Sequence, residues 1–558
     1  FLCTRKEEKY MSKRIKKMAV GTRSFEDNAA LIMGIFTLAV LCLCPVVYHR
    51  YYFDILETKY QFYCALAIGA AVIMFLYGLV SGRLKAFLSD FRWKERIRNL
   101  SVTDWAMIAF WLCNVISWLL CIDWRWEAFW GTSGRYNGVF LMTVYLVIYF
   151  LMTRFFRMRR WYLDAFLAVG IFVCLFGITD YFQMDLLGFK EGMVPEQRGI
   201  YTSTLGNINT YTIYVGAVLT VSALLFMLET NWKRMLWYYG NMVLASFALI
   251  MGTSDNAYLS LAALFGLAPL YLFRTRTGVR RYLVSVATFF TVIQCIDWIN
   301  AAFADVVVGI DSAFNLVANL SFLPVIVLVL WILAGAVSAS TLKKAAFLRA
   351  ASGKKSVSEA AAGNTDDRMG KWLVYVWIGV IALVIGTAVF VFYDANIAGH
   401  ADRYEAIRSY VVFDDEWGTE RGYVWRRSLE LFMTRLTPLQ QLFGYGPDTF
   451  RLLMQYYYDG KRISGRYVVY DSAHNEYLHY LVTVGIVGLL AYVTYLGSAI
   501  VRLCRGMKDR PEVVAVTFAV IAYSVQAVVN INIPIATPII YQLLYMGLSS
   551  IQKRDVSA

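Results

Sequence analysis

Charged residues are scarce in this chain. Only 16% of its 558 residues are Asp, Glu, Lys or Arg, while 59% are hydrophobic. This composition excludes an ordinary soluble globular protein and a disordered one. The nine cysteines lie in apolar runs, at their ends or in basic segments, and residues 394–473 contain none. Neither a disulfide framework nor a CxxC metal site is therefore expected.

Long apolar runs recur from one end of the chain to the other. About fourteen of them approach the roughly 20 residues that cross a bilayer as a helix. They lie near residues 29–47, 62–81, 103–121, 138–153, 162–180, 210–228, 235–252, 257–273, 282–298, 317–337, 372–393, 474–500, 512–530 and 537–551. We predict an all-α fold, a polytopic transmembrane helical bundle of about 14 spans (range 12–14) with a large extracytoplasmic helical loop.

The net charge of +14 is explained by where the basic residues stand. All 53 Lys and Arg residues fall between the predicted spans. With the N-terminus inside, 37 of them lie in inner segments and 16 in outer ones, and ten of those 16 lie in residues 394–473. The positive-inside rule then predicts that both termini are cytoplasmic, and it exempts a loop as long as 394–473. A multi-pass membrane protein is expected, and nucleic-acid binding is not needed to account for the charge.

These patterns divide the chain into six parts. They are a cytoplasmic N-terminal segment (1–28), the first part of the bundle (29–337), a flexible cytoplasmic linker rich in Ala, Ser, Gly and Lys (338–371), a transmembrane helix (372–393), an extracytoplasmic loop (394–473) and C-terminal transmembrane helices (474–558). Met11 has the surroundings of a natural start, so residues 1–10 are expected to be an upstream extension without function.

The loop 394–473 reads as two amphipathic helices. The first is predicted to begin after Thr419 as N-cap and to stop at Pro438. The second is predicted to begin with Pro447 in its first turn and to end at residues 459–460. The loop could be a solvated cap, but its helices also carry guanidinium groups suited to phosphate oxygens, namely Arg421, Arg426, Arg427, Arg435 and Arg451.

His474 is one of only four histidines and stands where this polar loop meets an apolar run. A neutral imidazole at such a boundary can accept a proton near pH 7. Asp471, three residues earlier, could orient the imidazole or cap the next helix. His479 is five residues further on, which suits a zinc pair poorly. Arginines and a histidine on the outer face fit one reaction: a hydroxyl attacks a glycan carried on a lipid diphosphate, which then leaves.

Three motifs stand out in this region: His474-Asn475 followed after nine residues by Gly485-x-x-Gly488, Arg421-x-x-x-Trp425, and Gly444-x-Gly446-Pro447-x-x-Phe450. Weaker support comes from Gly134-Arg135-Tyr-Asn-Gly138 and Thr204-Leu-Gly206-Asn207-Ile-Asn209. With these motifs the chain resembles the O-antigen ligase family of the O-antigen polymerase/ligase superfamily, which implies a multi-pass protein of the bacterial cytoplasmic membrane. The resemblance implies a polyprenyl-diphosphate-linked glycan donor, a lipid, glycan or other cell-envelope acceptor, and transfer without a metal or cofactor. It also implies that His474 is the base or orienting residue for the acceptor and that Arg421 binds the diphosphate.

One position departs from the family pattern. Where the family often has an arginine at the outer end of a middle helix, this chain has Asp255, so Arg135 or one of Arg426 and Arg427 would supply the missing charge. The predicted substrate-binding residues are Arg135, Asp255, Trp425, Arg426, Arg427, Gly446, Asp471 and Asn475. The departure leaves open whether the chain is a ligase or a surface-polysaccharide polymerase.

Two other classes of function compete with an enzyme. A transporter or flippase usually places ionisable residues in mid-span, whereas the acidic residues in these spans stand near span ends, at Asp164, Asp180 and Asp297. A structural partner in an envelope-synthesis complex would leave the arginines of the loop unexplained. The distribution of polar residues favours the enzyme.

Overall fold

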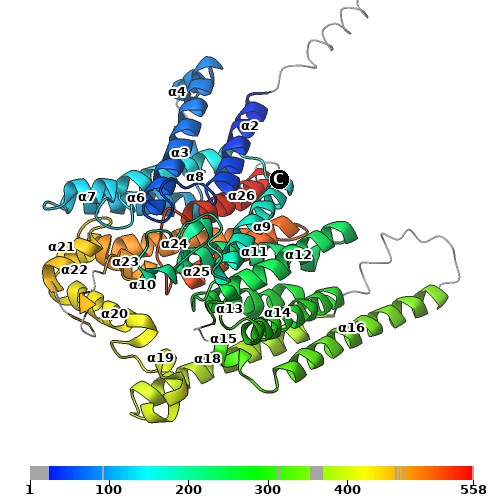
Figure 1. Cartoon of the computed structure of the whole chain (residues 1–558). Helices are drawn as coiled ribbons and strands as arrows, with labels where there is room; N and C mark the ends of the chain where they lie inside the picture. The colour runs from blue at the N-terminus through cyan, green and yellow to red at the C-terminus, as the bar shows by residue number, and fades with distance from the viewer. Residues whose placement is uncertain are drawn as a thin grey trace, which may run out of the picture.

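A computed structural model describes residues 24–90, 93–310, 314–351, 369–458, 462–463, 466–467 and 470–555. Helices make up most of this part of the chain (Figure 1). The strands described are two short antiparallel pairs, β1 (Tyr201–Thr202) with β2 (Gly206–Asn207) and β3 (Arg462–Ile463) with β4 (Arg466–Tyr467). The all-α prediction is confirmed.

Each predicted apolar run falls on a helix. These helices are α2 (Phe25–Leu38) continued by the π-helical η1 (Ala39–Leu43), α3 (Ile55–Val80), α6 (Val102–Leu120), α8 (Val139–Phe155), α9 (Trp161–Tyr181), α11 (Ile208–Leu228), α12 (Trp232–Met251), α13 (Ala257–Leu272), α14 (Arg276–Ala302), α16 (Leu323–Ala351), α18 (Trp372–Asn396), α23 (Glu476–Thr483) with α24 (Gly485–Gly506), α25 (Pro511–Gln526) and α26 (Thr537–Asp555). Eight helices in the described chain are long and apolar enough to cross a membrane, and four shorter apolar helices accompany them. The chain is therefore a polytopic membrane protein.

Short helices connect and cover the long ones. They are α4 (Arg83–Ser89), α5 (Trp93–Arg98), α7 (Arg125–Trp130), α10 (Pro195–Arg198), the 3-10 helices η2 (Ser203–Leu205) and η3 (Ala401–Ile407), α15 (Phe314–Ala318), α19 (Arg408–Val411), α20 (Trp417–Thr434), α21 (Pro438–Phe443) and α22 (Phe450–Tyr458). Helices α19 to α22 lie together at one end of the bundle (Figure 1). We call the end of the bundle that meets residues 394–473 the loop face.

Helix α11 is the centre of the bundle, and α18 is at its edge. Nearly the whole of α11 is buried, and it packs against α12 and α25. A helix that is apolar on every side is stable only inside a bundle or a bilayer. By contrast, none of the apolar window of α18 is buried inside the protein. In a membrane that surface of α18 faces lipid, which accounts for its exposed Val, Ile, Leu and Phe side chains.

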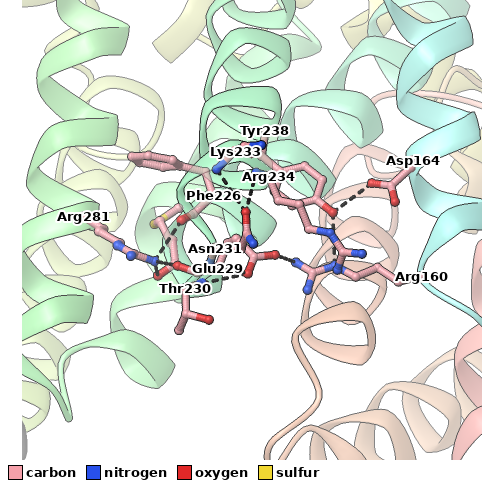
Figure 2. Close-up of polar contacts among 11 residues, drawn as sticks. Arg160, Asp164, Phe226, Glu229, Thr230, Asn231, Lys233, Arg234, Tyr238 and Arg281 are labelled. Carbon is pink, nitrogen blue, oxygen red and sulfur yellow. Dashed lines mark hydrogen bonds and ion pairs between the residues drawn. The ribbon is translucent and has the colours of Figure 1, made fainter. Parts of the chain in front are cut away.

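A polar cluster ties the helix ends together at the face opposite the loop (Figure 2). The buried Glu229 follows α11. Its carboxylate forms an ion pair with Arg160 at 2.6 Å and accepts hydrogen bonds from the backbone N–H groups of the next two residues. Tyr238 of α12 accepts a hydrogen bond from Arg160 and donates one to Asp164. Arg281 of α14 donates to the backbone carbonyls at the end of α11. The Arg281 contacts satisfy carbonyls that the end of a helix would otherwise leave unpaired.

The run predicted as one span at 474–500 is two helices. The chain breaks between α23 and α24 at Gly485, whose φ is +76°. A Cβ there would lie 2.4 Å from the backbone of Leu442, so the chain passes too close for any side chain. The carbonyl of Thr483 at the break is satisfied by Ser117 Oγ at 2.7 Å and by the N–H of Gly446 at 3.1 Å. Apolar periodicity carries no sign of such a break, and tertiary packing produces it.

The loop helices differ from prediction at their ends. Thr419 is not an N-cap, because its φ is +59° and its hydroxyl donates to the carbonyl of Gly418. Pro438 does stop the first helix, but it also opens α21, where Thr437 forms a capping box. Pro447 precedes α22 rather than entering it. The predicted end of that helix at 459–460, the predicted start at Met11 and residues 352–368 of the predicted linker lie outside the described residues, and α16 runs into the linker as far as Ala351.

Candidate functional site

A strained turn at the start of α20 holds Arg421. Gly418, Thr419 and Glu420 all have left-handed backbones, with φ of 59°, 59° and 69°. Two consecutive residues other than glycine in this region are uncommon and cost conformational energy. The Arg421 guanidinium bridges the turn, because Nη1 donates to the carbonyl of Gly418 at 2.6 Å and to Thr419 Oγ1 at 3.1 Å. The turn therefore directs one arginine toward the bundle.

Arg421 reaches the loop-face end of α13. Its Nη2 donates to Asn256 Oδ1 at 3.3 Å, and the charge of the adjacent Asp255 attracts it. Burial lowers the pKa of the Arg421 guanidinium and the Asp255 charge opposes this shift, so the group remains a cation. Its buried Nε has no hydrogen-bond acceptor among the described residues. A buried N–H donor on a cation marks a place for a polar or anionic ligand or a water molecule.

Two sequence motifs that are far apart in the chain interlock beside this arginine. The backbone N–H of Arg135 donates to Asp448 Oδ2 at 2.8 Å, and Ser133 Oγ donates to the Asp448 carbonyl at 3.0 Å. A Cβ on Gly134 would lie 2.9 Å from Asp448 Oδ1, so glycine permits this close approach. Burial raises the pKa of the Asp448 carboxyl to about 8. The loop before α8 and the turn before α22 thus form one rigid support.

Arg135 holds the segment that carries His474. Its Nη2 lies 2.9 Å from Asp471 Oδ1 and 2.7 Å from Oδ2. Burial alone would raise the pKa of Asp471, but Arg135 and then His474 outweigh it, and the pKa lies below its ordinary value. Asp471 is therefore an ion-pair partner and not a helix cap. Asn475 caps α23, because its Oδ1 accepts the N–H of Leu478 at 3.0 Å.

His474 is close enough to both arginines for their charges to act on its side chain. Its backbone is left-handed (φ 46°) and its side chain is partly buried. Burial, then Arg421 and Arg135, lower its pKa to about 4, and only Asp471 opposes them. The imidazole is therefore neutral at pH 7 and can accept a proton. The geometry leaves a neutral histidine available beside two cations.

Trp425 links Arg421 to the backbone of the histidine segment. Its indole Nε1 donates to the carbonyl of Ala473 at 3.0 Å, and its ring lies 5.1 Å from that of Trp417. Arg421 and Trp425 are one helical turn apart in α20, as their spacing predicts. A single helix therefore supplies both a cation and the contact that positions the residue before His474.

Three other predicted residues lie in different surroundings. Arg426 forms an exposed ion pair with Asp415, and Arg427 pairs with Glu430 and lies over the ring of Tyr423. Gly446 is a packing position, since a Cβ there would lie 2.8 Å from Cys121 Sγ. The structure brings together Arg421, Arg135, Asp471, His474, Asn475, Trp425 and Asp255, and it places Arg426 and Arg427 in contacts of their own.

Sequence reasoning missed several residues that support the site. Nothing in the sequence marks Asn256 or Asp448 as a supporting residue, except that each lies next to residues of the motifs. Glu476, two residues after His474, is buried. Its carboxylate accepts hydrogen bonds from Tyr492 Oη at 2.5 Å and from Tyr523 Oη at 2.9 Å. A carboxylate at the start of an apolar run could have been recognised as the centre of a polar network. Among the described residues, no three His, Cys, Asp or Glu side chains gather as a set of metal ligands.

The fold and this site define a polytopic helical membrane protein with an arginine- and histidine-containing site at one end of its bundle. Residues 313–493 match the family model described as O-Antigen ligase. The match supports the membrane O-antigen ligase/polymerase superfamily, whose members carry out glycosyl transfer with lipid-linked glycans and acceptors in membranes. No curated protein matches the chain.

Proposed function

We propose that this protein transfers an oligo- or polysaccharide from a polyprenyl diphosphate to an acceptor hydroxyl at the outer face of the bacterial cytoplasmic membrane. The observation that supports this most is that a neutral His474 lies within reach of the charges of Arg421 and Arg135. A proton acceptor beside two cations suits a reaction in which a hydroxyl is deprotonated and a diphosphate departs.

The donor would bind through its diphosphate. Arg421 is held by a turn of its own helix and by Asn256, so its fork is oriented before the donor arrives. A planar guanidinium forms two parallel, charge-assisted bonds to phosphate oxygens. Asp255 stabilises the buried cation while the site is empty of donor. When the diphosphate binds, its negative charge takes over that role.

Donor binding would also prepare the histidine. Arg421 and Arg135 hold the pKa of His474 at about 4, which makes it a weak base. The diphosphate charge offsets these two cations, so the pKa of His474 rises toward its ordinary value. His474 then takes the proton of the acceptor hydroxyl as its oxygen bonds to the anomeric carbon. The bond from that carbon to the diphosphate oxygen breaks, and the diphosphate leaves with the electron pair, stabilised by the arginines. The base becomes effective only when the donor is present.

The test compares variants of purified protein in lipid nanodiscs. Arg421→Ala is expected to lower transfer from a polyprenyl-diphosphate glycan by about 10²–10³-fold, as for removal of an oriented oxyanion donor. Arg421→Lys keeps the charge without the planar fork, so its loss should be smaller. His474→Gln should lower turnover while leaving donor binding within a few-fold. Arg426→Ala is the matched control, because Arg426 lies on the same helix as Arg421 but forms an exposed ion pair with Asp415. Full transfer by both Arg421→Ala and His474→Gln would overturn the mechanism.

The same chemistry serves a ligase and a polymerase. When the acceptor is an unrelated lipid or envelope molecule, the donor glycan is transferred once. When the acceptor is another lipid-linked glycan, the product grows. The length distribution of the products in the same assay distinguishes the two activities, and both depend on Arg421 and His474.

A further inference from the structure

A polar cavity of about 400 Å³ opens beside the proposed site. It lies where the segment after α9 folds back against the loop-face end of α12. Its lining includes Asp180, Gln183, Lys190, Arg198, Tyr201 and Thr253. Its volume is within the range of small-ligand sites in proteins. None of these residues has a role in the proposed chemistry.

Asp180 is the buried acceptor of this cavity. Its Oδ2 accepts the backbone N–H of Ser203 at 2.6 Å and lies 3.4 Å from Thr202 Oγ1. Its Oδ1 accepts no hydrogen bond from any described residue, and the Lys190 Nζ lies 3.8 Å away. A buried carboxylate oxygen without a donor is costly unless a ligand or water hydroxyl supplies one. The cavity therefore presents an acceptor to its contents.

Three lining residues other than glycine have left-handed backbones. They are Gln183 (φ 55°), Asp185 (φ 37°) and Thr253 (φ 50°). For a β-branched residue such as Thr253 this conformation is an outlier. Strain of this kind persists where surrounding structure enforces it, and it gathers at binding sites. The walls of the cavity are held in shape by tertiary contacts.

The cavity and Arg421 flank the same short turn. Thr253 lines the cavity, Ser254 Oγ donates to Asn209 Oδ1 at 2.7 Å, and Asn256 Oδ1 accepts from Arg421. A ligand whose diphosphate lies at Arg421 would extend its next group toward this cavity. The lining offers carboxylates, an amide, hydroxyls, two cations and two tyrosines, with positive and negative charges in balance. Such a mixture suits a neutral, hydroxyl-rich ring better than a strongly charged ligand.

We propose that this cavity is a saccharide subsite that binds one pyranose ring of the glycan substrate, with Asp180 accepting a ring hydroxyl. The inference rests on the proposed function, because it assumes that a glycan reaches Arg421. The ring could belong to the donor glycan or to a sugar of the acceptor, and both offer the same hydroxyl chemistry.

The experiment uses the full protein in nanodiscs with two probes, polyprenyl diphosphate alone and polyprenyl diphosphate carrying an oligosaccharide. Asp180→Asn removes the buried negative charge and replaces one acceptor oxygen by an amide donor. Arg198→Ala removes a cation at the exposed rim. Asp164→Asn is the matched control for the first, since it lies on the same helix at the opposite end of the bundle (Figure 2). Gln197→Ala is the control for the second, on the same short helix but outside the lining.

If the donor glycan occupies the cavity, both lining variants bind the glycan-bearing lipid about tenfold more weakly, the loss expected for a hydrogen bond to a charged group. Binding of the bare lipid and the behaviour of both controls do not change. If an acceptor sugar occupies it, donor binding is unchanged and the KM for the acceptor rises by a similar factor. Unchanged donor binding and unchanged acceptor KM in Arg198→Ala and Asp180→Asn would overturn the inference. Failure of the proposed function has a different signature, namely bare-lipid binding that does not depend on Arg421.

Discussion

His474 and Asp448 are predicted to link stability to pH with opposite signs. The pKa of folded His474 is about 4, below its ordinary value of 6.5. Between these values the unfolded chain binds a proton that the folded chain does not, so stability falls as pH falls. The pKa of folded Asp448 is about 8, above its ordinary 3.8. Between those values the folded chain binds the extra proton, so stability rises as pH falls.

The size of each effect follows from the width of the pH window. Each pH unit inside the window changes the free energy of unfolding by about 1.4 kcal/mol for one group. From pH 6.5 to pH 5 both groups are inside their windows, so each contributes about 2 kcal/mol and the two contributions cancel. Asp471 adds no slope there, because its folded pKa lies below the ordinary value and it stays ionised in both states.

The stabilities of two single variants should therefore change with pH in opposite directions. Relative to the unsubstituted protein, His474→Gln should gain about 2 kcal/mol on acidification from pH 6.5 to 5, and Asp448→Asn should lose about 2 kcal/mol. The assay is reversible unfolding in neutral detergent micelles at both pH values. Groups elsewhere contribute equally to each protein and drop out of the comparison.

The double variant is the internal control. Because it lacks both groups, its pH dependence should match that of the unsubstituted protein. If both single variants showed the same pH dependence as the parent, the assignment of a neutral His474 and a protonated Asp448 would be refuted.

Three further predictions test the support of the site. Trp425→Phe removes the indole donor to the carbonyl before the histidine; turnover should fall about tenfold while stability falls by about 1 kcal/mol, and equal loss of donor binding would contradict a positioning role. Gly485→Ala forces a side chain onto a left-handed backbone and should prevent stable expression. Its control is Gly497→Ala on the same helix, where the space around the glycine is open; this change should be neutral or stabilising by up to about 1 kcal/mol. Asp255→Asn should strengthen binding of bare polyprenyl diphosphate a few-fold at low salt, because it removes an anion that competes for the same arginine; weaker binding would instead show that the carboxylate is needed to hold that arginine in place.

Much of the architecture was predictable because membrane helices must satisfy their backbone groups internally. A run of about 20 apolar residues leaves few alternatives, and every predicted run is helical in the structure. The break at Gly485 was not predictable, because the sequence there is as apolar as any continuous helix. It depends on the backbone of Leu442, which comes from a different part of the chain.

The candidate site was likewise predictable in part. Spacing in α20 placed Arg421 and Trp425 on one side of the helix, and the structure brings both to the His474 segment. The motif Arg421-x-x-x-Trp425 singled out Arg421, but spacing could not show which partner each arginine of this helix meets. In the structure Arg421 meets Asn256 and Arg426 meets Asp415.

The sequence by itself determined that this protein is a helical membrane bundle with one long polar loop. Composition and charge distribution suffice for this, because the thickness and polarity of the bilayer impose the same requirements on every chain. The tertiary structure alone decided which charges meet. Arg135 lies 313 positions from Asp448 and 336 from Asp471, yet the three residues form one support. The low pKa of His474 comes from burial together with Arg421 and Arg135, which meet it only in the folded chain. Electrostatic interactions depend on distance and burial in the folded protein, and neither can be read from the order of residues along the chain.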